Sequence, residues 1–414
     1  FNFTIIMGGT VKLPYSEFFT RGQFETLPET LAIQDKRQTF TLGIPKETTM
    51  IENRVAIVPN SVRVLVASGF HVLIESGAGE KSNYTDHAYS EAGAEICSDK
   101  RTVFQANILI KVAPPTLDEL EMMAIDQVLI SPLHLPIINE AYIEKLLQKR
   151  ITAFAMEYLQ SADGSFPIVR IMSEIAGMSV MLTAGELLKS HSGGRGLLLG
   201  GVSGVPPAKV VILGAGVVAE YAVKTALGLG CSVRIFDNDI SKIMRLQTNV
   251  GRHLHTSAIN PVYLAHQLTS ADVVIGAIHS KHGRAPILIT EEMVSRMKEG
   301  SILIDVSIDQ GGCFETSEIT TLENPTFIKH GVIHYCVPNI PSQVSRTASN
   351  AISNIITPLL VKIIESHNME NLMTLHEGIR NGCYTYKACL TNEYLSKRYG
   401  KKYTNLSLLL TSVL

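Results

Sequence analysis

A glycine-rich turn between a predicted strand and a predicted helix is the clearest chemical feature of the sequence. The strand KVVILG (209–214) runs into Gly214-Ala215-Gly216-Val217-Val218-Ala219. In this G-x-G-x-x-A pattern, Gly214 permits a tight turn, Gly216 lets the backbone approach a pyrophosphate, and Ala219 lets helix and strand pack closely. The helix N-terminal amides would face the phosphates. The pattern predicts a dinucleotide site, with a purely structural turn as the alternative.

An acidic residue at the end of the next predicted strand supports the same interpretation. Asp237 closes SVRIFD (232–237), 18 positions beyond Ala219, where a ribose 2′-hydroxyl would need an acceptor. No Arg or Lys directly follows Asp237, and its carboxylate would repel a 2′-phosphate. The sequence therefore predicts NAD as the cofactor rather than NADP.

Five polar residues near predicted strand ends are suited to a small anionic substrate. They are Arg54, Lys111, His134, Asp309 and Asn339. An Arg binds a carboxylate through two hydrogen bonds, a His exchanges protons near neutral pH, and a carboxylate can act beside the nicotinamide. Structural roles are the alternatives: a surface ion pair for Arg54, a structural or snorkelling amine for Lys111, a core position for His134 and a turn cap for Asp309.

The first half of the chain alternates between short apolar runs and amphipathic segments of helix length. Strands are predicted at 41–44, 71–75, 107–112, 126–131 and 151–156, with helices near 60–69, 86–93, 116–123 and 138–149. This alternation predicts an α/β fold in which helices cover a parallel sheet.

A second series of the same kind follows a long predicted helix (169–188) and a loop rich in glycine and proline. Its strands are predicted at 209–214, 232–237, 272–277, 301–306 and 332–336, its helices up to about 230 and near 240–249, and closing helices at 345–366 and 383–397. We expect an extension (1–40), a discontinuous α/β substrate domain (41–168 and 346–414) and a Rossmann-type doubly wound NAD-binding domain (169–345). Hinges are expected near 165–170 and 341–346.

Composition limits the classes of partner. The 414 residues include 36 Lys+Arg and 38 Asp+Glu, so the net charge of −2 gives no reason to expect nucleic acid or an anionic membrane as partner. Apolar residues make up 45%, yet no uninterrupted run reaches the roughly 18 residues of a membrane span. Six cysteines without a C-x-x-C pair favour a reducing cytoplasm. His253 and His255, two apart, are poorly spaced for joint ligation, and no metal site is predicted.

The same residues give the sequence a resemblance to a known family. It resembles the alanine dehydrogenases, which share their fold with the NAD-binding subunit of proton-translocating transhydrogenase. The resemblance runs through GIPKE (43–47), ENRVAIVP (52–59), GAGE (77–80), LHLP, MSEIAG (172–177), GGRG, GGVSGVPPA, the glycine turn, IDQGGCFE (308–315) and YCVPNIP (335–341). IDQGGCFE is the most specific stretch, because the transhydrogenase subunit has a different version there.

The resemblance implies a function and a role for each matching residue. The implied reaction is the reversible, NAD-dependent oxidation of L-alanine to pyruvate and ammonium by a homohexamer. The implied site has His134 as catalytic acid/base, Asp309 as catalytic aspartate, Arg54 on the substrate carboxylate, Asn339 near substrate and nicotinamide, and Ser173, Asp237 and Lys242 on the cofactor.

One position departs from the family pattern. Family members read K-V-K-E-P where this chain has Lys111-Val112-Ala113-Pro114-Pro115, so Ala113 replaces the family's substrate-binding lysine. Lys111 would share a strand face with position 113, about 6–7 Å away, and is expected to bind substrate in its place. Two alternatives stay open: an oxidoreductase for another amino or imino acid, including saccharopine-type relatives, and a catalytically silent NAD-binding protein.

Overall fold

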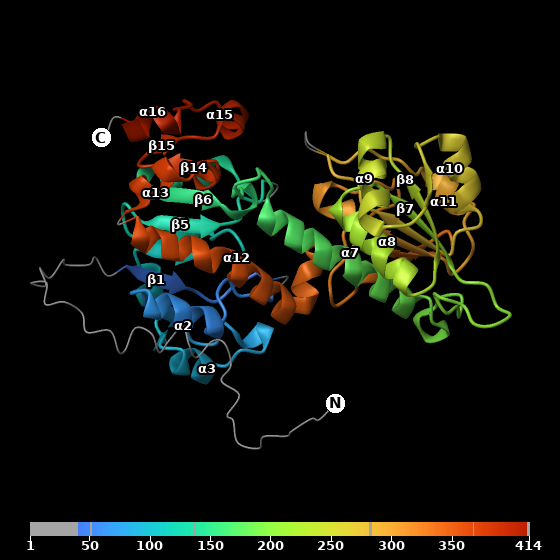
Figure 1. Cartoon of the computed structure of the whole chain (residues 1–414), viewed down its shortest axis with the longest axis horizontal. Helices are drawn as coiled ribbons and strands as arrows, with labels where there is room; N and C mark the ends of the chain where they lie inside the picture. Colours follow the sequence, from blue (N-terminus) through green and yellow to red (C-terminus); the bar gives the residue numbers. More distant parts are fainter. Residues whose placement is uncertain (1–39, 50–51, 136–137, 281–283, 367, 412–414) are drawn as a thin grey trace, which may run out of the picture. The chain divides into compact units, whose positions relative to one another are not determined.

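The computed structural model describes residues 40–49, 52–135, 138–280, 284–366 and 368–411. Its strands form two sheets, each built mainly of parallel strands (Figure 1). The extension predicted for residues 1–40 lies outside the described residues, except for Phe40.

The first sheet has eight strands in the order β15-β14-β6-β5-β4-β1-β2-β3. Strands β1 to β6 run parallel to their neighbours, whereas β14 pairs antiparallel with β6 and with β15. The bounds are β1 Thr41–Ile44, β2 His71–Glu75, β3 Glu95–Cys97, β4 Ile108–Ile110, β5 Val128–Ser131, β6 Thr152–Ala155, β14 Cys383–Tyr386 and β15 Cys389–Leu390. The chain thus returns to its first sheet after completing its second.

Helices accompany both series of strands, and most begin at a side chain that caps them. Thr116 accepts from the Glu119 amide while the Glu119 carboxylate accepts from the Thr116 amide, a reciprocal cap for α5. In the first part, the helices are α2 Pro59–Ala67, α3 Asp86–Glu91, α4 Lys100–Phe104, α5 Leu117–Met122, α6 Glu140–Gln148, α12 Ser345–Glu365, α13 Met369–Leu375, α14 Glu377–Arg380, α15 Glu393–Tyr399 and α16 Leu406–Thr411, with 3-10 turns η2 Glu80–Ser82 and η3 Met156–Tyr158.

The second sheet has seven strands in the order β12-β13-β11-β10-β7-β8-β9. All pairs are parallel except β12 with β13. The strands are β7 Lys209–Leu213, β8 Ser232–Phe236, β9 His255–Ser257, β10 Val273–Gly276, β11 Ile302–Asp305, β12 Thr326–Lys329 and β13 Val332–Tyr335; the helices are α7 Pro167–Leu187, α8 Val217–Gly228, α9 Ile240–Val250, α10 Pro261–Leu268 and α11 Glu291–Ser295, with η4 Ser190–Ser192, η5 Val306–Gln310 and η6 Ile340–Val344. The parallel strands β9-β8-β7-β10-β11-β13 follow the Rossmann order, in which a ligand binds where the strand order reverses, here between β7 and β10.

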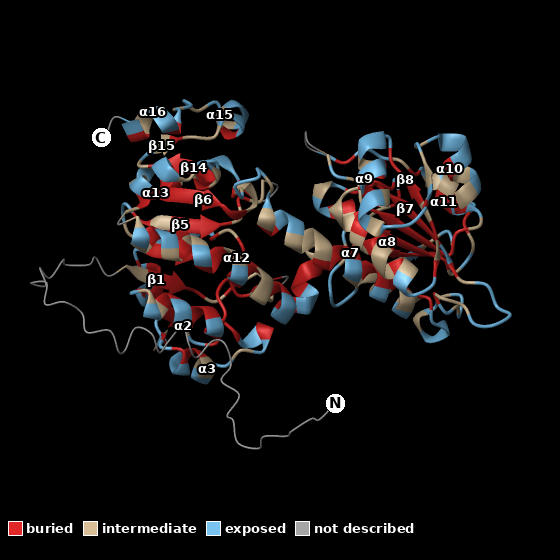
Figure 2. Cartoon of the chain, in the orientation of Figure 1, coloured by how far each residue is buried: buried red, intermediate tan, exposed pale blue. Residues whose placement is uncertain are grey.

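The inner strands of both sheets, among them β4, β6, β10 and β11, are buried on both faces and are red in Figure 2, whereas the edge strands β3, β9 and β12 are largely accessible. This explains why the sequence has near-continuous apolar runs there instead of an alternation of apolar and polar residues.

The predicted Rossmann-type α/β class is confirmed, and one predicted element is wrong. Residues 383–386 form β14, not the start of a helix, and a helix begins only at Glu393. The strand CYTY is buried on both faces at the side of β6, and such an apolar run does not distinguish a buried strand from a helix by its period.

Two helical segments are long and apolar enough to pass a length-and-composition test for membrane spans: α7 and Ile340–Glu365. Both also pack within the protein, α7 against α8 and α12 against α2. Core helices of soluble proteins pass the same test, so it is weak evidence for a membrane span.

Small residues let α7 and α8 cross closely. A Cβ atom at Gly177 would lie 2.3 Å from the Val218 carbonyl oxygen and 2.8 Å from the Tyr221 Cβ. Ala176 and Ala222 are also buried at this crossing. The crossing matters for function because it brings Ser173 of α7 and the first turn of α8 to one cavity.

We expect Gly177→Ala to lower the free energy of unfolding by about 1–3 kcal/mol, because a backbone atom would have to move. The measurement is chemical unfolding followed by circular dichroism. The control is Gly228→Ala in α8, where an added Cβ meets nothing within 4 Å; it should be neutral or stabilise by up to about 1 kcal/mol. Equal stability of the two variants would contradict the close crossing.

Candidate active site

The glycine turn after β7 has the geometry that a dinucleotide needs. Gly214 has φ = +108°, and a Cβ there would lie 2.4 Å from the Ala277 carbonyl oxygen at the end of β10. Gly216 precedes the first residue of α8, and a Cβ there would meet nothing within 4 Å. Open space therefore lies beside the positive end of a twelve-residue helix, where a pyrophosphate can approach the backbone.

The Asp237 carboxylate is fixed beside this turn. One oxygen accepts from the Ala215 amide at 2.7 Å, and the other accepts from the Asp239 amide at 2.8 Å. Each carboxylate oxygen has a further lone pair for a ribose hydroxyl. Lys242 lies in the first turn of α9, with its amine 4.0 Å from the Asp239 carboxylate. These residues fit NAD, and the Asp237 charge disfavours a 2′-phosphate.

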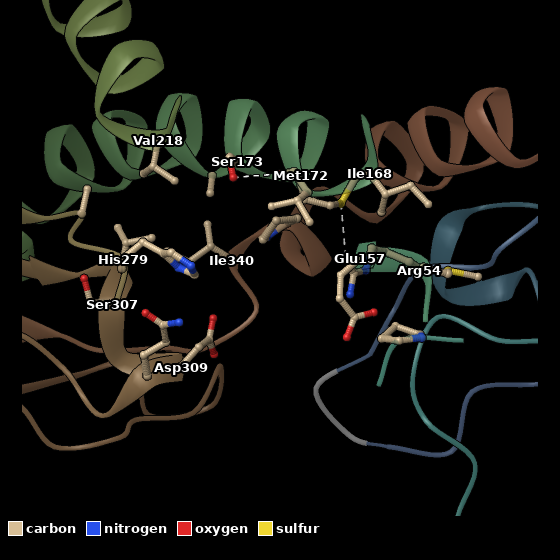
Figure 3. Close-up of a pocket in the computed structure, with 18 of the residues that line it drawn as sticks. Arg54, Glu157, Ile168, Met172, Ser173, Val218, His279, Ser307, Asp309 and Ile340 are labelled. Carbon is tan, nitrogen blue, oxygen red and sulfur yellow. Dashed lines mark hydrogen bonds between the residues drawn. The ribbon is translucent and has the colours of Figure 1, made fainter. Parts of the chain in front are cut away.

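A cavity of about 390 Å³ adjoins the turn and is drawn in Figure 3. The residues that line this cavity come both from the segments of the first sheet and from the segments of the second sheet. In Figure 3, Arg54 and Glu157 lie on one wall, Ser307 and Asp309 lie on the opposite wall, and Ser173 projects from α7. A second cavity of about 740 Å³ shares Glu157, His279, Asp309 and Gln310 with the first and adds His134. Of the predicted site residues, Arg54, Ser173 and Asp309 line the first cavity, and His134 and Asp309 line the second. Lys111, Asn339, Gly214, Gly216, Ala219, Asp237 and Lys242 are not among the residues that line either cavity.

Arg54 is held rigidly by an adjacent carboxylate. Its Nε and Nη2 atoms each donate to a different oxygen of Glu52 at 2.7 Å, and Nη1 contacts the Met172 sulfur at 3.2 Å. The Asn339 side-chain amide donates to the same Glu52 at 3.0 Å. This two-pronged pair uses one edge of the guanidinium, and the remaining protons on Nη1 and Nη2 are available to a substrate carboxylate.

The loop that carries Arg54 is attached to α12 by serine side chains. The amides of Val55 and Val58 donate to Ser349 Oγ at 2.9 Å and Ser353 Oγ at 3.1 Å. Just before α12, Ser342 Oγ accepts from the Asn53 amide at 2.8 Å. These hydroxyls satisfy buried backbone donors that have no partner in a sheet or helix, so they fix the loop in place.

His134 lies in a left-handed turn after β5. Its φ is +43°, a conformation that costs energy for a residue with a Cβ. Glu157, which follows β6, offsets this cost because its carboxylate accepts from the amides of Leu133 at 2.8 Å and His134 at 3.2 Å. Burial and the nearby charge of Arg54 lower the pKa of His134, so its imidazole is neutral at physiological pH.

Asp309 projects into the cavity from η5, the turn that follows β11. Solvent reaches its side chain through the cavity, but the surrounding protein removes much of its water and raises its pKa to about 6. The Asn339 amide and the charge of Arg54 act in the opposite direction. Asp309 is thus ionised at neutral pH and lies within electrostatic reach of Arg54.

A buried aspartate holds the turn that carries Asp309. The Asp305 carboxylate accepts from the amides of Ser307 at 3.0 Å and Cys313 at 2.9 Å, and from Ser317 Oγ at 2.5 Å. Ser307 Oγ then joins η5 to the end of β10 by donating to the Ile278 carbonyl at 2.8 Å. The loop with His279 and the loop with Asp309 are therefore one hydrogen-bonded unit.

Lys111 does not reach the cavity, which corrects its expected role in substrate binding. Its side chain is 1% exposed, and its amine lies 3.0 Å from the Glu47 carboxylate and 3.5 Å from Glu119. Burial alone would lower the pKa of Lys111, but the two carboxylates raise it above its ordinary value and keep the amine charged. Glu47 also accepts from the Val112 amide at 2.6 Å. The structural role that the sequence left open fits this position.

Glu157, His279 and Gln310 are among the cavity residues that were not identified from the sequence. Glu52, which orients Arg54, was also missed. Glu52 and Glu157 each follow a β-strand or its loop at the carboxyl edge of the first sheet, where ligands of open α/β sheets bind. A search for polar residues that follow predicted strands could therefore have found Glu52 and Glu157. In the described part of the chain, no group of three His, Cys, Asp or Glu residues is placed to hold a metal ion.

The fold and the cavity define a class of protein, the nicotinamide-dinucleotide-dependent oxidoreductases. Family models described as "Alanine dehydrogenase/PNT, N-terminal domain" and "Alanine dehydrogenase/PNT, C-terminal domain" match residues 43–176 and 180–393. The chain belongs to the alanine dehydrogenase/PNT family, and its cofactor is NAD.

Individual members of the family are similar to this chain over most of its length. Alanine dehydrogenase 2 of Staphylococcus aureus (strain USA300) is 38% identical over 366 residues, which cover 88% of this chain and 98% of that protein. A solved L-alanine dehydrogenase superposes with a TM-score of 0.82 at 36% identity, covering 87% of this chain and 99% of the other. A transhydrogenase from Sinorhizobium meliloti has a TM-score of 0.72 at 25% identity, covering 86% and 99%.

We expect Lys111→Met to lower the free energy of unfolding by about 3–5 kcal/mol, because Glu47 would be left buried without its cation and Glu119 would keep only Lys100. Urea unfolding measures this change. The control is Lys145→Met, which removes a pair with the exposed Glu121 carboxylate and should cost much less than Lys111→Met. A Lys111→Met protein of unchanged stability but higher KM for the amino acid would contradict a structural role.

Proposed function

We propose that the chain catalyses the reversible, NAD-dependent oxidative deamination of L-alanine to pyruvate and ammonium. The supporting observation is that Arg54 and Asp309 line the same cavity as Val218, in the first turn of the dinucleotide helix. A carboxylate bound by Arg54 therefore brings an adjacent Cα close to where a nicotinamide would lie. The names of the relatives support alanine as the amino acid.

In this proposal Arg54 and Asn339 bind and orient the substrate. The free edge of the Arg54 guanidinium takes the substrate carboxylate, while Glu52 keeps the side chain from turning away. Asn339 has φ = +54° and contacts both Glu52 and Asp309, so it links the two walls of the cavity. Ser173, Gly214, Gly216, Ala219, Asp237 and Lys242 would hold the cofactor.

His134 and Asp309 divide the acid–base work. NAD supplies the hydride acceptor when it is bound. His134 is neutral, so its imidazole can take a proton from the water that hydrolyses the imine. Asp309 is ionised above pH 6, so its carboxylate stabilises the cationic imine and orients that water.

We further propose that residues 41–168 and 346–414 form the substrate domain, and 169–345 the NAD-binding domain, of a cytoplasmic enzyme. The sheets support this division, because β1 to β6 and β14 share one sheet while β7 to β13 share the other. The six free cysteines, five of them buried, are compatible with a reducing compartment. We propose neither nucleic acid nor membrane as partner, because the net charge is −2.

We expect purified wild-type protein to reduce NAD with L-alanine and to oxidise NADH with pyruvate plus ammonium. Absorbance of NADH measures both directions across a panel of amino and 2-oxo acids. His134→Ala should lose at least about 100-fold in kcat because the proton acceptor is gone, while NADH binding by fluorescence titration stays within about threefold. Loss of NADH binding as well would show that His134 is structural.

Ala113 favours one alternative, turnover of a different amino acid. Ala113 stands where the family has its substrate-binding lysine, and Lys111 does not replace that amine in the cavity. In the same panel, activity with another amino acid but none with alanine would establish this alternative. Silence on every pair, with NADH bound, would refute both enzymatic assignments.

We propose a homohexamer, as the family resemblance implies, with one apolar face in a subunit interface. Met178 and Leu182 on α7 are 42% and 63% exposed, and Leu198, Val202 and Val205 in the following loop are 55% to 66% exposed. Such a grouping of large exposed apolar residues is typical of a protein–protein contact.

We expect light scattering after gel filtration to give six times the 45.2 kDa chain mass. Leu182→Glu should shift the protein to smaller species, because a charge would be buried in the contact. Val262→Glu, at an apolar residue of α10 that is 81% exposed, is the control and should leave the mass unchanged. A monomeric wild-type protein would contradict the proposal.

A further inference from the structure

The carboxylate of Glu157 lines the cavity, and its hydrogen bonds to the Leu133 and His134 backbone do not use the full acceptor capacity of its two oxygens. It follows β6 in η3 and lines both parts of the cavity. Its Oε1 atom accepts from the Leu133 amide at 2.8 Å and the His134 amide at 3.2 Å, whereas Oε2 is 3.1 Å from that same Leu133 amide. One donor shared between two oxygens leaves acceptor capacity on Oε2.

The charge of Glu157 also lacks a partner. In the described ranges, no Lys, Arg or His nitrogen lies within ion-pair distance of its carboxylate. In contrast to Glu157, the carboxylates of Glu52, Glu47 and Glu119 are each paired with a cationic side chain. Burial raises the pKa of Glu157, since its charge is balanced only by backbone amides. A partly buried carboxylate without a cation is costly unless a ligand supplies one.

The arrangement of charges around the cavity indicates which cation fits. An amino acid carries a carboxylate and an ammonium on the same carbon, and Arg54 accounts for the carboxylate. Figure 3 places Glu157 on the same wall as Arg54, opposite Asp309. Asp309, the other carboxylate among the residues that line the cavity, faces the imine carbon in the proposed reaction. Glu52, which lies behind Arg54, is already paired with that guanidinium.

We propose that the Glu157 carboxylate binds the nitrogen of the substrate, as the ammonium group of the amino acid in one direction and as free ammonium in the other. The inference rests on the proposed function, from which it takes its reactants. An N–H of the ammonium would donate to Oε2, while Oε1 continues to hold the Leu133–His134 backbone. Glu157 would thus couple nitrogen binding to the placement of His134.

Glu157→Gln tests the charge separately from the positioning. The Gln carbonyl oxygen can still accept from Leu133 and His134, but an NH2 group replaces the charged oxygen that would meet the ammonium. In reductive amination with saturating NADH and pyruvate, we expect the KM for ammonium to rise at least about tenfold. The KM values for pyruvate and NADH should stay within about threefold of wild type.

A binding measurement gives a readout that does not depend on turnover. With NADH present, L-alanine should raise the melting temperature of the wild-type protein but not that of Glu157→Gln, whereas stabilisation by pyruvate should be the same in both. Glu95→Gln, at an exposed carboxylate in edge strand β3, is the matched control and should behave as wild type. Glu157→Ala should lose kcat as well, because it also frees the His134 turn.

Two results would overturn the inference. One is a Glu157→Gln enzyme with an unchanged KM for ammonium; the other is a fall in kcat alone, with every KM preserved, which would leave Glu157 a positioning residue only. Failure of the proposed function is a separate outcome, because it appears as an inactive wild type with pyruvate. If another 2-oxo acid is the substrate, the same ammonium titration applies with that acid.

Discussion

The ion pair between Glu52 and Arg54 is the interaction on which the site depends. Arg54 comes from a loop without regular structure, and its guanidinium would otherwise sample many rotamers. Glu52 fixes one edge of it with two hydrogen bonds of 2.7 Å, and Asn339, from beyond β13, binds the same carboxylate. The serines of α12 hold the backbone beneath. A flexible side chain thereby becomes a fixed cation facing the cavity.

The strand order reverses once in each sheet, and the two points of reversal differ in what occupies them. In the second sheet the reversal between β7 and β10 is lined by Gly214 and Ala277, which leaves room for a dinucleotide. In the first sheet the reversal lies between β1 and β4, and the buried pair of Glu47 and Lys111 fills it. The residues proposed to bind substrate therefore lie after β5 and β6 and in the Arg54 loop.

Much of the fold follows from local pattern, whereas parts of the site depend on contacts distant in sequence. The turn at Gly214 and the strand before Asp237 could be predicted because each has a local signature. The strand at 383–386 could not, since its neighbour β6 lies more than 200 residues earlier. Lys111 was misjudged because the sequence does not reveal that Glu47 and Glu119 converge on its amine. Glu157 could not be identified because a single Glu after an apolar strand has no distinctive pattern. Its role becomes visible only in the structure, where none of the described residues places a cation beside it.

In the proposed reaction, a hydride leaves the α-carbon of alanine for NAD in the cavity between Arg54 and Asp309. The most direct measurement uses L-alanine deuterated at Cα, with mass spectrometry of the reduced cofactor. We expect the deuterium to appear in the nicotinamide ring, at one deuterium for each pyruvate formed. Pyruvate formed without label in the cofactor, or no pyruvate from a protein that still binds NAD, would contradict it.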